Sequence, residues 1–493
     1  MVSFLNLQPS PSALIQSLRD IGYTMESAVA DIIDNSITAG AVHINIRFTW
    51  NDGEPWLAIA DDGHGMAGDE LTDAMRLGSK APLELRGADD LGRFGLGMKT
   101  ASFSQCRRLT VISRKNGILS GREWNLNLIE SDPETGWKLR VIESEEISDD
   151  KIAAGLLSYI ESDGTIVLWR DLDRFDNSEK KLNSLINNTG KHLELVFHRF
   201  LSPQKPQKKL KIFINGGSLV AFNPFNALNP ATQELPEQII SIEGERIIVQ
   251  PYVLPHYSKT ARDDYEKYGS EGGYLQNQGF YVYRNKRLII KGTWFRLIKK
   301  EELTKLIRVQ VDIPNSLDHL WRIDVKKSQA SPPELMRDEL KTIINRIASS
   351  GKRVYRQRGK RISSQIKEPA WERTASGGKI HYSINRNHSL IRQYTKQLDH
   401  DQSRDFEIIV SMLESSFPTD LFYSDVAKKP ESVNKPEFKI EEYSHLVASY
   451  IETMRQASIP ETELLERLFS IDPFAGYQEE IKELIKEKGM LDE

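Results

Sequence analysis

Three short blocks of residues within the first hundred positions constrain this chain more than any other feature. They are Asp31-Ile-Ile-Asp34-Asn35, Asp61-Asp-Gly-His-Gly-Met66 and Gly92-Arg-Phe-Gly-Leu-Gly-Met-Lys99. A lone glycine-rich run or a lone Asp-x-Gly-x-Gly is a weak signal, since both also occur in ordinary turns. Their order and spacing, followed by Asp163-Gly-Thr165 on an expected strand, indicate a nucleotide pocket.

The first block is expected on a helix, because apolar residues recur with helical spacing from Ser27 to Ser36. Asp31 and Asn35 are four positions apart and therefore share one face of that helix. A carboxylate can orient a water molecule. An amide oxygen suits Mg²⁺, which prefers hard oxygen ligands and keeps several of its waters. The block predicts a hydrolytic carboxylate at Asp31 and a magnesium ligand at Asn35.

The other two blocks supply groups for a base and for phosphates. A buried strand over residues 54–60 is expected to end at Asp61, whose carboxylate can accept the exocyclic amine of adenine, and the following glycines let the backbone approach the base. The third block precedes an expected helix from Met98 to Ser104, whose first N–H groups can donate to phosphate oxygens beside the charge of Lys99. The candidate nucleotide-binding residues are Asn35, Asp61, Gly63, Gly65, Met66, Gly92, Phe94, Gly95, Leu96, Gly97, Met98, Lys99 and Thr165.

This arrangement resembles the GHKL superfamily, the group of gyrase B, Hsp90, histidine kinases and MutL. The resemblance implies a Bergerat-fold α/β sandwich that binds ATP and Mg²⁺. It implies that Asp31 is the catalytic acid, Asn35 the Mg²⁺ ligand and Asp61 the adenine-binding carboxylate. It also places Gly65 beside the base, Gly164 and Thr165 in the pair that helps to hold adenine, and residues 77–97 in a lid over the triphosphate.

One position departs from the family. The ATPase branches usually have Glu where this chain has Asp31, so the carboxylate is one methylene shorter. A displacement of about 1 Å can cost roughly 10²-fold in rate, and slow hydrolysis is therefore expected. Glu26 is a weaker alternative base, because its helical phase is poor for the same face. A histidine kinase is disfavoured, since that branch has an amide at this position and a phospho-accepting helix pair before the pocket.

A second domain is expected after a helical segment near Lys191 to Leu201. Strand-like alternation marks residues 209–215, 279–289 and 307–314, followed by Trp321 to Ser328. This resembles the transducer domain of MutL and MORC proteins, of ribosomal S5 type, in which a lysine reaches the γ-phosphate. Lys326 or Lys327 is that lysine by position, and at most one reaches the nucleotide, because neighbouring strand residues point to opposite faces. The alternative is that both are exposed lysines at a strand end.

Three sequence segments indicate which subgroup of the superfamily this chain resembles. Tyr283-Arg-Asn-Lys-Arg-Leu, Pro314-Asn-Ser-Leu-Asp and Ile323-Asp-Val-Lys-Lys-Ser resemble bacterial MORC-like ATPases, a group found beside restriction and other anti-phage genes. The resemblance extends over residues 1–345 and implies a phage-defence context.

Composition agrees with a large protein of several domains. At 493 residues the length favours three domains. The single cysteine, Cys106, excludes a disulfide framework and a CxxC zinc module, and it is expected to be buried at a helix end. No leader and no run of 18 apolar residues is found, so a cytoplasmic location without a membrane partner is expected.

A basic stripe stands out against the net charge of −4. Residues 341–367 contain nine Lys or Arg and no Asp or Glu. Such a stripe can neutralise several phosphates without reading sequence. The alternative is a solvated helix end followed by a basic linker. The candidate DNA-binding residues are Lys352, Arg353, Arg356, Arg358, Lys360 and Arg361.

The expected fold class is a multidomain chain of mixed α+β and α/β type. It comprises an ATP-binding domain (1–200), a transducer-like domain with a mixed sheet (201–345), a basic helix end and connector (346–400) and a C-terminal helical domain (401–493). Apolar spacing of helical period near residues 406–413, 443–454 and 477–488 supports the last. Such a domain would dock a partner or a second copy, or simply cap the chain.

The expected function is a slow, Mg²⁺-dependent ATPase that dimerises as an ATP-gated clamp. Its partners would be a second copy, duplex DNA or other proteins of a defence system. One alternative is an Hsp90-like, partner-remodelling ATPase without a DNA role. Another is a nucleotide-binding switch with negligible turnover, which the departure at Asp31 supports.

Overall fold

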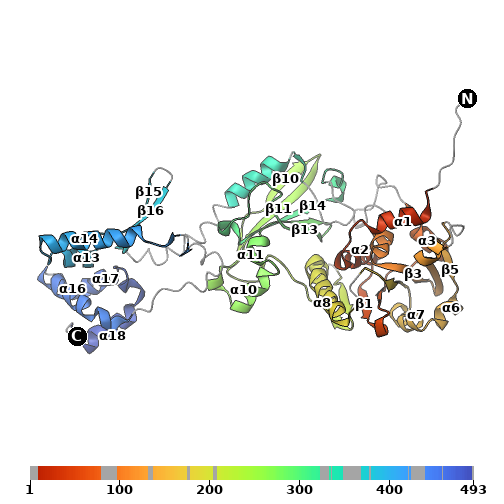
Figure 1. Ribbon diagram of the computed structural model, residues 1–493, viewed down its shortest axis with the longest axis horizontal. Helices are drawn as coiled ribbons and strands as arrows, with labels where there is room; N and C mark the ends of the chain where they lie inside the picture. Colours follow the sequence, from red (N-terminus) through yellow and green to blue (C-terminus); the bar gives the residue numbers. More distant parts are fainter. Residues whose placement is uncertain are drawn as a thin grey trace, which may run out of the picture. The chain divides into compact units, whose positions relative to one another are not determined.

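The computed structural model describes residues 9–78, 97–131, 137–174, 178–203, 208–321, 332–334, 336–347, 368–376, 379–419, 421–422, 439–457 and 459–490. The chain forms two compact units, Met1–Ala348 and Ser349–Glu493. Figure 1 shows their helices and strands.

The first unit begins with a mixed sheet in the order β5-β4-β3-β6-β2-β1-β7-β8. Among these strands β1 and β7 run parallel, and the other neighbours are antiparallel. The strands are β1 (His43–Thr49), β2 (Trp56–Asp61), β3 (Cys106–Lys115), β4 (Ile118–Asn125), β5 (Arg140–Ile142), β6 (Gly164–Leu172), β7 (Lys211–Ile214) and β8 (Gly217–Ser218).

Helices cover both faces of this sheet, and β2 explains why. Leu57 and Ile59 belong to one core cluster while Ala58 and Ala60 belong to another, because successive side chains of a strand point to opposite faces. The first cluster is completed by α1 (Pro11–Arg19), α2 (Met25–Thr38), α3 (Gly68–Met75), α4 (Gly97–Phe103), α5 (Leu126–Ser131), α8 (Glu179–Val196) and α9 (His198–Leu201). The second is completed by α6 (Ser144–Asp149) and α7 (Lys151–Leu156).

A second mixed sheet follows, in the order β10-β11-β14-β12-β13, with β9 beside β11. One face packs on a helical stretch within residues 336–347. The other face carries Tyr281 and Tyr283, and Phe225 packs in the same cluster, as does Leu195 of α8. The strands are β9 (Gln233–Glu234), β10 (Gln238–Ile242), β11 (Glu245–Val253), β12 (Gly279–Arg284), β13 (Arg287–Thr293) and β14 (Ile307–Ile313), and the helices α10 (Arg262–Gly269) and α11 (Gly273–Gln276) precede β12.

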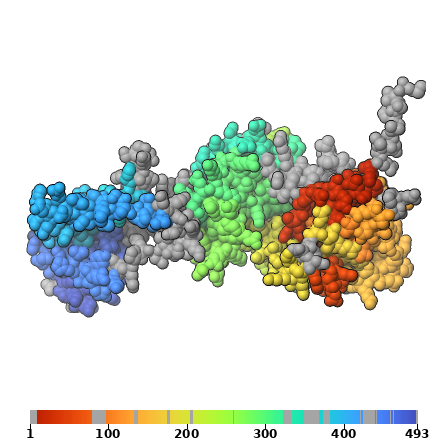
Figure 2. All heavy atoms as spheres, in the orientation of Figure 1, coloured from red at the N-terminus to blue at the C-terminus, as the bar shows by residue number. Residues whose placement is uncertain are grey.

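Helix α8 joins the two sheets of the first unit. It packs against α2 of the N-terminal layer and against β13 of the second sheet. Figure 2 shows the yellow α8 region directly beside the green residues of the second sheet. A side chain on β13 can therefore reach the helix that carries Asp31.

The second unit contains a hairpin and a helical bundle. The hairpin is β15 (Trp371–Ser376) with β16 (Lys379–Ile384), and the helices are α13 (Ser389–Thr395), α14 (His400–Ser415), α16 (Ser444–Gln456), α17 (Glu461–Leu468) and α18 (Gln478–Glu487). Residues of α16, α17 and α18 form one apolar core. Of the helices that the structure describes, none has the length and apolar character needed to cross a membrane.

The strands expected at residues 54–60 and 307–314 and the helices expected near 98–104, 191–201, 406–413, 443–454 and 477–488 are present. Cys106 is buried, as expected, but it begins β3 instead of lying at a helix end, since α4 ends at Phe103. The strand expected at residues 209–215 was assigned to the second domain, and this is wrong, because β7 pairs parallel with β1 in the first sheet.

Two further expectations differ from the structure. The run 279–289 is divided into β12 and β13 by a two-residue turn at Asn285 and Lys286, whose φ angles are 47° and 69°. The connector expected up to residue 400 contains the β15–β16 hairpin and α13 within its described part. Antiparallel backbone pairing gives this segment order, although its strands have no strong apolar alternation.

Candidate functional site

Helix α2 presents the first group of expected site residues. It begins at a capping box in which the Thr24 hydroxyl accepts a hydrogen bond from the Ser27 N–H at 3.3 Å. One and a half turns later Asp31 is buried, with 3% of its surface exposed, whereas Asn35 one turn beyond is exposed. The predicted helix and the predicted spacing of these two residues are therefore confirmed.

Two side chains from outside α2 surround Asp31. The Tyr23 hydroxyl donates a hydrogen bond to Asp31 Oδ2 at 2.8 Å, and Arg287 Nη2 lies 3.7 Å from Asp31 Oδ1. The start of α4 is also close, since a Cβ atom built on Gly97 would lie 3.8 Å from Asp31 Oδ2. The carboxylate is therefore held from the loop before α2 and from the second sheet.

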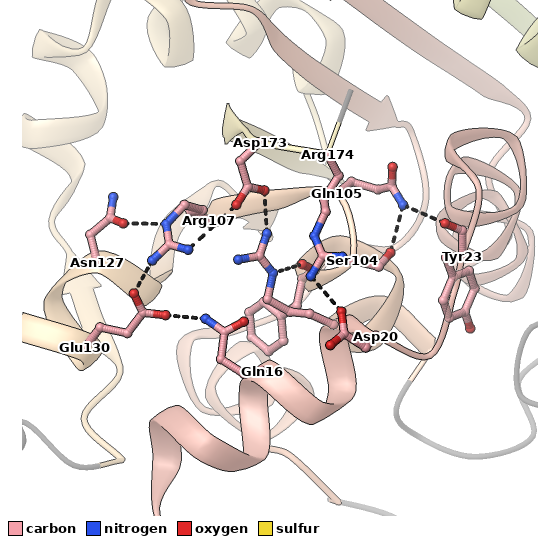
Figure 3. Close-up of polar contacts among 12 residues, drawn as sticks. Gln16, Asp20, Tyr23, Ser104, Gln105, Arg107, Asn127, Glu130, Asp173 and Arg174 are labelled. Carbon is pink, nitrogen blue, oxygen red and sulfur yellow. Dashed lines mark hydrogen bonds and ion pairs between the residues drawn. The ribbon is translucent and has the colours of Figure 1, made fainter. Parts of the chain in front are cut away.

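The loop that carries Tyr23 is itself fixed by the polar network in Figure 3. Gln105 Nε2 donates to the Tyr23 carbonyl at 3.3 Å and to Ser104 Oγ at 2.9 Å. The Arg19 Nε at the end of α1 donates to the Phe103 carbonyl at 2.9 Å. Four further side chains, Asp20, Arg107, Asp173 and Arg174, add ion pairs around them. The position of the Tyr23 hydroxyl thus depends on α1 and α4.

Asp34, three residues after Asp31, is bound by the same arginine. Arg287 Nε lies 2.9 Å from both carboxylate oxygens of Asp34, which is 1% exposed. Arg287 Nη1 donates to the Leu288 carbonyl at 2.8 Å. Two buried carboxylates on one helix are thus brought to one guanidinium.

The expected adenine carboxylate, Asp61, lies at the end of β2. Its Oδ2 accepts from the Ser36 hydroxyl at 2.7 Å and its Oδ1 from the Gly63 N–H at 3.0 Å. Burial raises the pKa of Asp61 above its usual value, against the lowering effect of these hydrogen bonds. The Thr165 backbone also lowers this pKa by hydrogen bonding. A carboxylate has about four acceptor positions, so Asp61 keeps capacity for an exocyclic amine.

Thr165 lies opposite Asp61 in the sheet, and Ser113 lies opposite Thr165 on the next strand. Ser113 Oγ is 2.9 Å from Thr165 Oγ1, donates to the Gly164 carbonyl at 3.0 Å and accepts from the Met66 N–H at 2.8 Å. Sequence reasoning missed Ser113, because its role follows from strand register. The alternation of side chains along β3 is the signal that could have indicated that the Ser113 hydroxyl faces inward.

Gly65 is required by geometry. Its φ is +61°, and a Cβ atom there would lie 2.0 Å from the Arg114 carbonyl oxygen. Gly164 is similar, since a Cβ atom would lie 2.2 Å from the Asp61 carbonyl oxygen. The backbone at the expected base-binding edge is therefore packed too closely for any side chain.

The surroundings of Lys99 differ from those expected of a lysine that binds phosphate. It is 3% exposed, and its Nζ donates to the carbonyl of Ala74 in α3 at 2.9 Å. Burial lowers the pKa of Lys99 to about 8. The ammonium ties α4 to α3 in this arrangement.

Several expected site residues lie outside the described part of the chain. These are Gly92, Phe94, Gly95 and Leu96 of the glycine block, the paired Lys326 and Lys327, and the basic residues Lys352, Arg353, Arg356, Arg358, Lys360 and Arg361. Gly97 and Met98 are described and half-buried, at the start of α4.

The chemistry of the described residues fits a magnesium nucleotide. Within the described ranges no group of three or more His, Cys, Asp or Glu is placed to hold a metal ion. Mg²⁺ needs no such group, because it is commonly held by one or two protein oxygens together with substrate phosphates and water. The exposed amide of Asn35, on the same helix as the buried carboxylate Asp31, carries an oxygen of that type.

Comparison with known proteins agrees with this geometry. Residues 23–153 match the family described as histidine kinase-, DNA gyrase B- and HSP90-like ATPase. The ATPase morc-1 of Caenorhabditis elegans is 34% identical over 94 residues, the DNA mismatch repair protein MutL of Aliivibrio fischeri 34% over 113 residues, and Protein MICRORCHIDIA 4 of Arabidopsis thaliana 33% over 92 residues. These alignments cover 18 to 21% of this chain and 11 to 17% of the relatives.

Proposed function

We propose that this chain binds ATP with Mg²⁺ and hydrolyses it slowly, since residues 23–153 match the family described as histidine kinase-, DNA gyrase B- and HSP90-like ATPase. The observation that carries the proposal is the pairing of a buried carboxylate, Asp31, with an exposed amide, Asn35, on one helix. Asp61 and Thr165 on the adjacent strands supply the base-binding partners.

Nucleotide binding uses the end of β2 and the start of β6, which lie side by side in the first sheet. The adenine amine donates to Asp61, whose carboxylate is oriented by Ser36 and Gly63. Thr165, held by Ser113, supplies a hydroxyl beside it. Asn35 would hold Mg²⁺ through its amide oxygen, and the ion when bound would neutralise phosphate charge. Residues 77–97 would close over the triphosphate as a lid.

Hydrolysis uses Asp31. Its carboxylate accepts a proton from the attacking water, and Tyr23 fixes the orientation of Oδ2. One of Lys326 and Lys327 would contact the γ-phosphate. Slow turnover follows from the short aspartate side chain, which places the base about 1 Å farther back than a glutamate would.

The output we propose is an ATP-gated clamp formed by two copies of the chain in the cytoplasm of a bacterium. The support for DNA as its target is the similarity to proteins named for DNA mismatch repair, over a small part of their length. Lys352, Arg353, Arg356, Arg358, Lys360 and Arg361 are the proposed phosphate contacts. A role in restriction or anti-phage defence extends the resemblance of residues 1–345 to bacterial MORC-like ATPases.

A nucleotide-binding switch with negligible turnover is the second candidate. The burial of Asp31 favours it, since 2% of this side chain is exposed and Oδ2 is already bound by Tyr23. Such a protein would bind ATP with full affinity and report its presence through the lid.

The deciding experiment is steady-state ATP hydrolysis with and without duplex DNA. Wild type is compared with Asp31→Ala and Asn35→Ala, and with Asp149→Ala as an exposed control on the opposite face of the sheet. Turnover that DNA stimulates and that both site variants abolish supports the clamp. Turnover indifferent to DNA supports a partner-remodelling ATPase. ATP binding without turnover supports the switch, and no ATP binding contradicts the proposal.

A further inference from the structure

One arginine of the second sheet reaches the helix that carries the hydrolytic carboxylate. Arg287 opens β13 and is 5% exposed. Its Nε lies 2.9 Å from both oxygens of Asp34, and its Nη2 lies 3.7 Å from Oδ1 of Asp31. A guanidinium is planar and rigid, so the hydrogen bonds of Nε to Asp34 also fix the positions of the two Nη atoms of Arg287.

The hairpin turn explains how this contact arises. Arg284 and Arg287 are paired across the two-residue turn at Asn285 and Lys286, so both arginines lie at one end of the sheet. They serve different partners. Arg284 Nε binds both oxygens of Asp318, at 2.8 and 2.9 Å, within the second sheet's own layer. Arg287 instead crosses to α2.

The charges around Arg287 show why it matters there. Asp31 and Asp34 are both buried on α2, and two buried carboxylates are costly without a cation. The Tyr23 hydroxyl binds Asp31, and His192 of α8 lies within electrostatic range of Arg287 and of Lys291 on β13. Burial and the charges of Arg287 and Lys291 lower the pKa of His192 to about 3, so this histidine is neutral at physiological pH. Arg287 is thus a cation fixed between the two carboxylates.

We propose that Arg287 is a positioning residue for Asp31: held by Asp34, it orients the hydrolytic carboxylate and thereby makes hydrolysis depend on the placement of the second sheet. This inference rests on the proposed ATPase function for its kinetic consequence. The contact itself is independent of nucleotide, so its coupling can be measured without turnover.

The first test is a double-mutant cycle on unfolding, without nucleotide. Arg287→Met, Asp31→Asn and the double variant are unfolded in denaturant. If Arg287 acts on Asp31, the effects are non-additive, with a coupling of about tenfold in the unfolding equilibrium constant. Arg284→Met with Asp31→Asn is the matched control and is additive. Additivity in both cycles overturns the inference, whether or not wild type hydrolyses ATP.

The second test is kinetic. Arg287→Lys keeps a cation for Asp34 and folds, but a single ammonium cannot also reach Asp31 in the same geometry. We expect kcat to fall about tenfold or more while KM for ATP changes by less than about threefold.

The kinetic test has a matched control, and failure of the inference can be told apart from failure of the proposed function. Arg284→Lys breaks the bidentate pair with Asp318 and leaves kcat and KM as in wild type. Equal behaviour of the two lysine variants overturns the inference. If wild type has no turnover, the proposed function fails, and the unfolding cycle still decides whether Arg287 and Asp31 are coupled.

Discussion

The two ends of the candidate nucleotide site are built in different ways. At the base end, Asp61, Thr165 and Ser113 lie directly opposite one another on β2, β6 and β3 of a single sheet. At the hydrolytic end, Asp31 depends on Tyr23 from the loop before α2 and on Arg287 from the second sheet.

The difference indicates how recognition and hydrolysis are divided. Strand neighbours are fixed by backbone hydrogen bonds, so the base end changes little unless the sheet itself unfolds. Contacts between layers can shift by rigid-body motion without breaking a sheet. Base recognition should therefore belong to the N-terminal layer alone, whereas hydrolysis should respond to the second sheet.

The largest effect is expected from adding a side chain at the base end of the candidate site. Gly65→Ala puts a Cβ atom 2.0 Å from the Arg114 carbonyl oxygen, at a φ of +61°. We expect a loss of more than about 3 kcal/mol in stability and no ATP binding. Thermal unfolding and nucleotide titration measure this. Gly216→Ala is the control, with a φ of +84° in open space, and should cost about 1 kcal/mol. Equal effects would contradict the packing argument.

The hydrolytic end is broken by Asp34→Asn. Removing one partner of a buried ion pair costs about 3–5 kcal/mol, and here it also releases the arginine beside Asp31. Denaturant unfolding should show the loss, and kcat should fall with little change in KM. Asp318→Asn removes the partner of Arg284 and should spare kcat. A fall in ATP affinity in Asp34→Asn would show that the two ends are not separate.

Asp61→Asn should act on affinity alone. The amide presents a donor toward the adenine amine, and we expect about 100-fold weaker ATP binding, or about 3 kcal/mol. In wild type the ionised carboxylate is the acceptor, so affinity is constant above its pKa and falls as pH drops through it. Because burial raises that pKa, the fall begins at a higher pH than for an exposed aspartate. Titration of nucleotide from pH 7 to pH 4 tests this, and an unchanged affinity would contradict it.

Lys99 gives a smaller, pH-dependent effect. Burial lowers its pKa to about 8, so between about pH 8 and 10.5 the unfolded chain binds more protons than the folded chain. Wild-type stability should therefore rise with pH in that window relative to Lys99→Met, by at most about 1.4 kcal/mol per pH unit. Denaturant unfolding at pH 7, 8 and 9.5 measures the difference. A constant difference would show that the lysine is solvated.

The smallest effect is expected from Ser113→Ala, which removes the hydroxyl that holds Thr165 and the Met66 N–H. The expected loss is about 1–2 kcal/mol in stability, with ATP binding weakened about tenfold and kcat unchanged. Isothermal titration and unfolding measure both quantities. A change in kcat instead would move Ser113 to the hydrolytic end.

The sequence predicted what depends on local spacing. Asp31 and Asn35 lie on one helix, and Asp61 ends a buried strand, because periodicity within a segment determines both. Ser113 and Arg287 were missed, since each acts through a neighbour remote in sequence. Tyr23 was missed although it is only eight residues from Asp31, because it lies in the loop before α2, where helical periodicity gives no direction for the side chain.

The organisation of the strands shows the same limit. The pairing of β7 with β1 could not be inferred from alternation, which is the same in either sheet. The turn between β12 and β13 was hidden because Lys286 has a positive φ without being glycine. The two-residue turn decides where Arg287 lies, so the missed turn and the missed site residue have one cause.

The most direct test of the division between the two ends is the pair of kinetic constants of Arg287→Lys, measured beside Arg284→Lys. The account predicts that Arg287→Lys loses about tenfold or more in kcat with KM for ATP within about threefold of wild type, and that Arg284→Lys keeps both. A loss of ATP affinity in Arg287→Lys, or an equal loss of kcat in both variants, would contradict it.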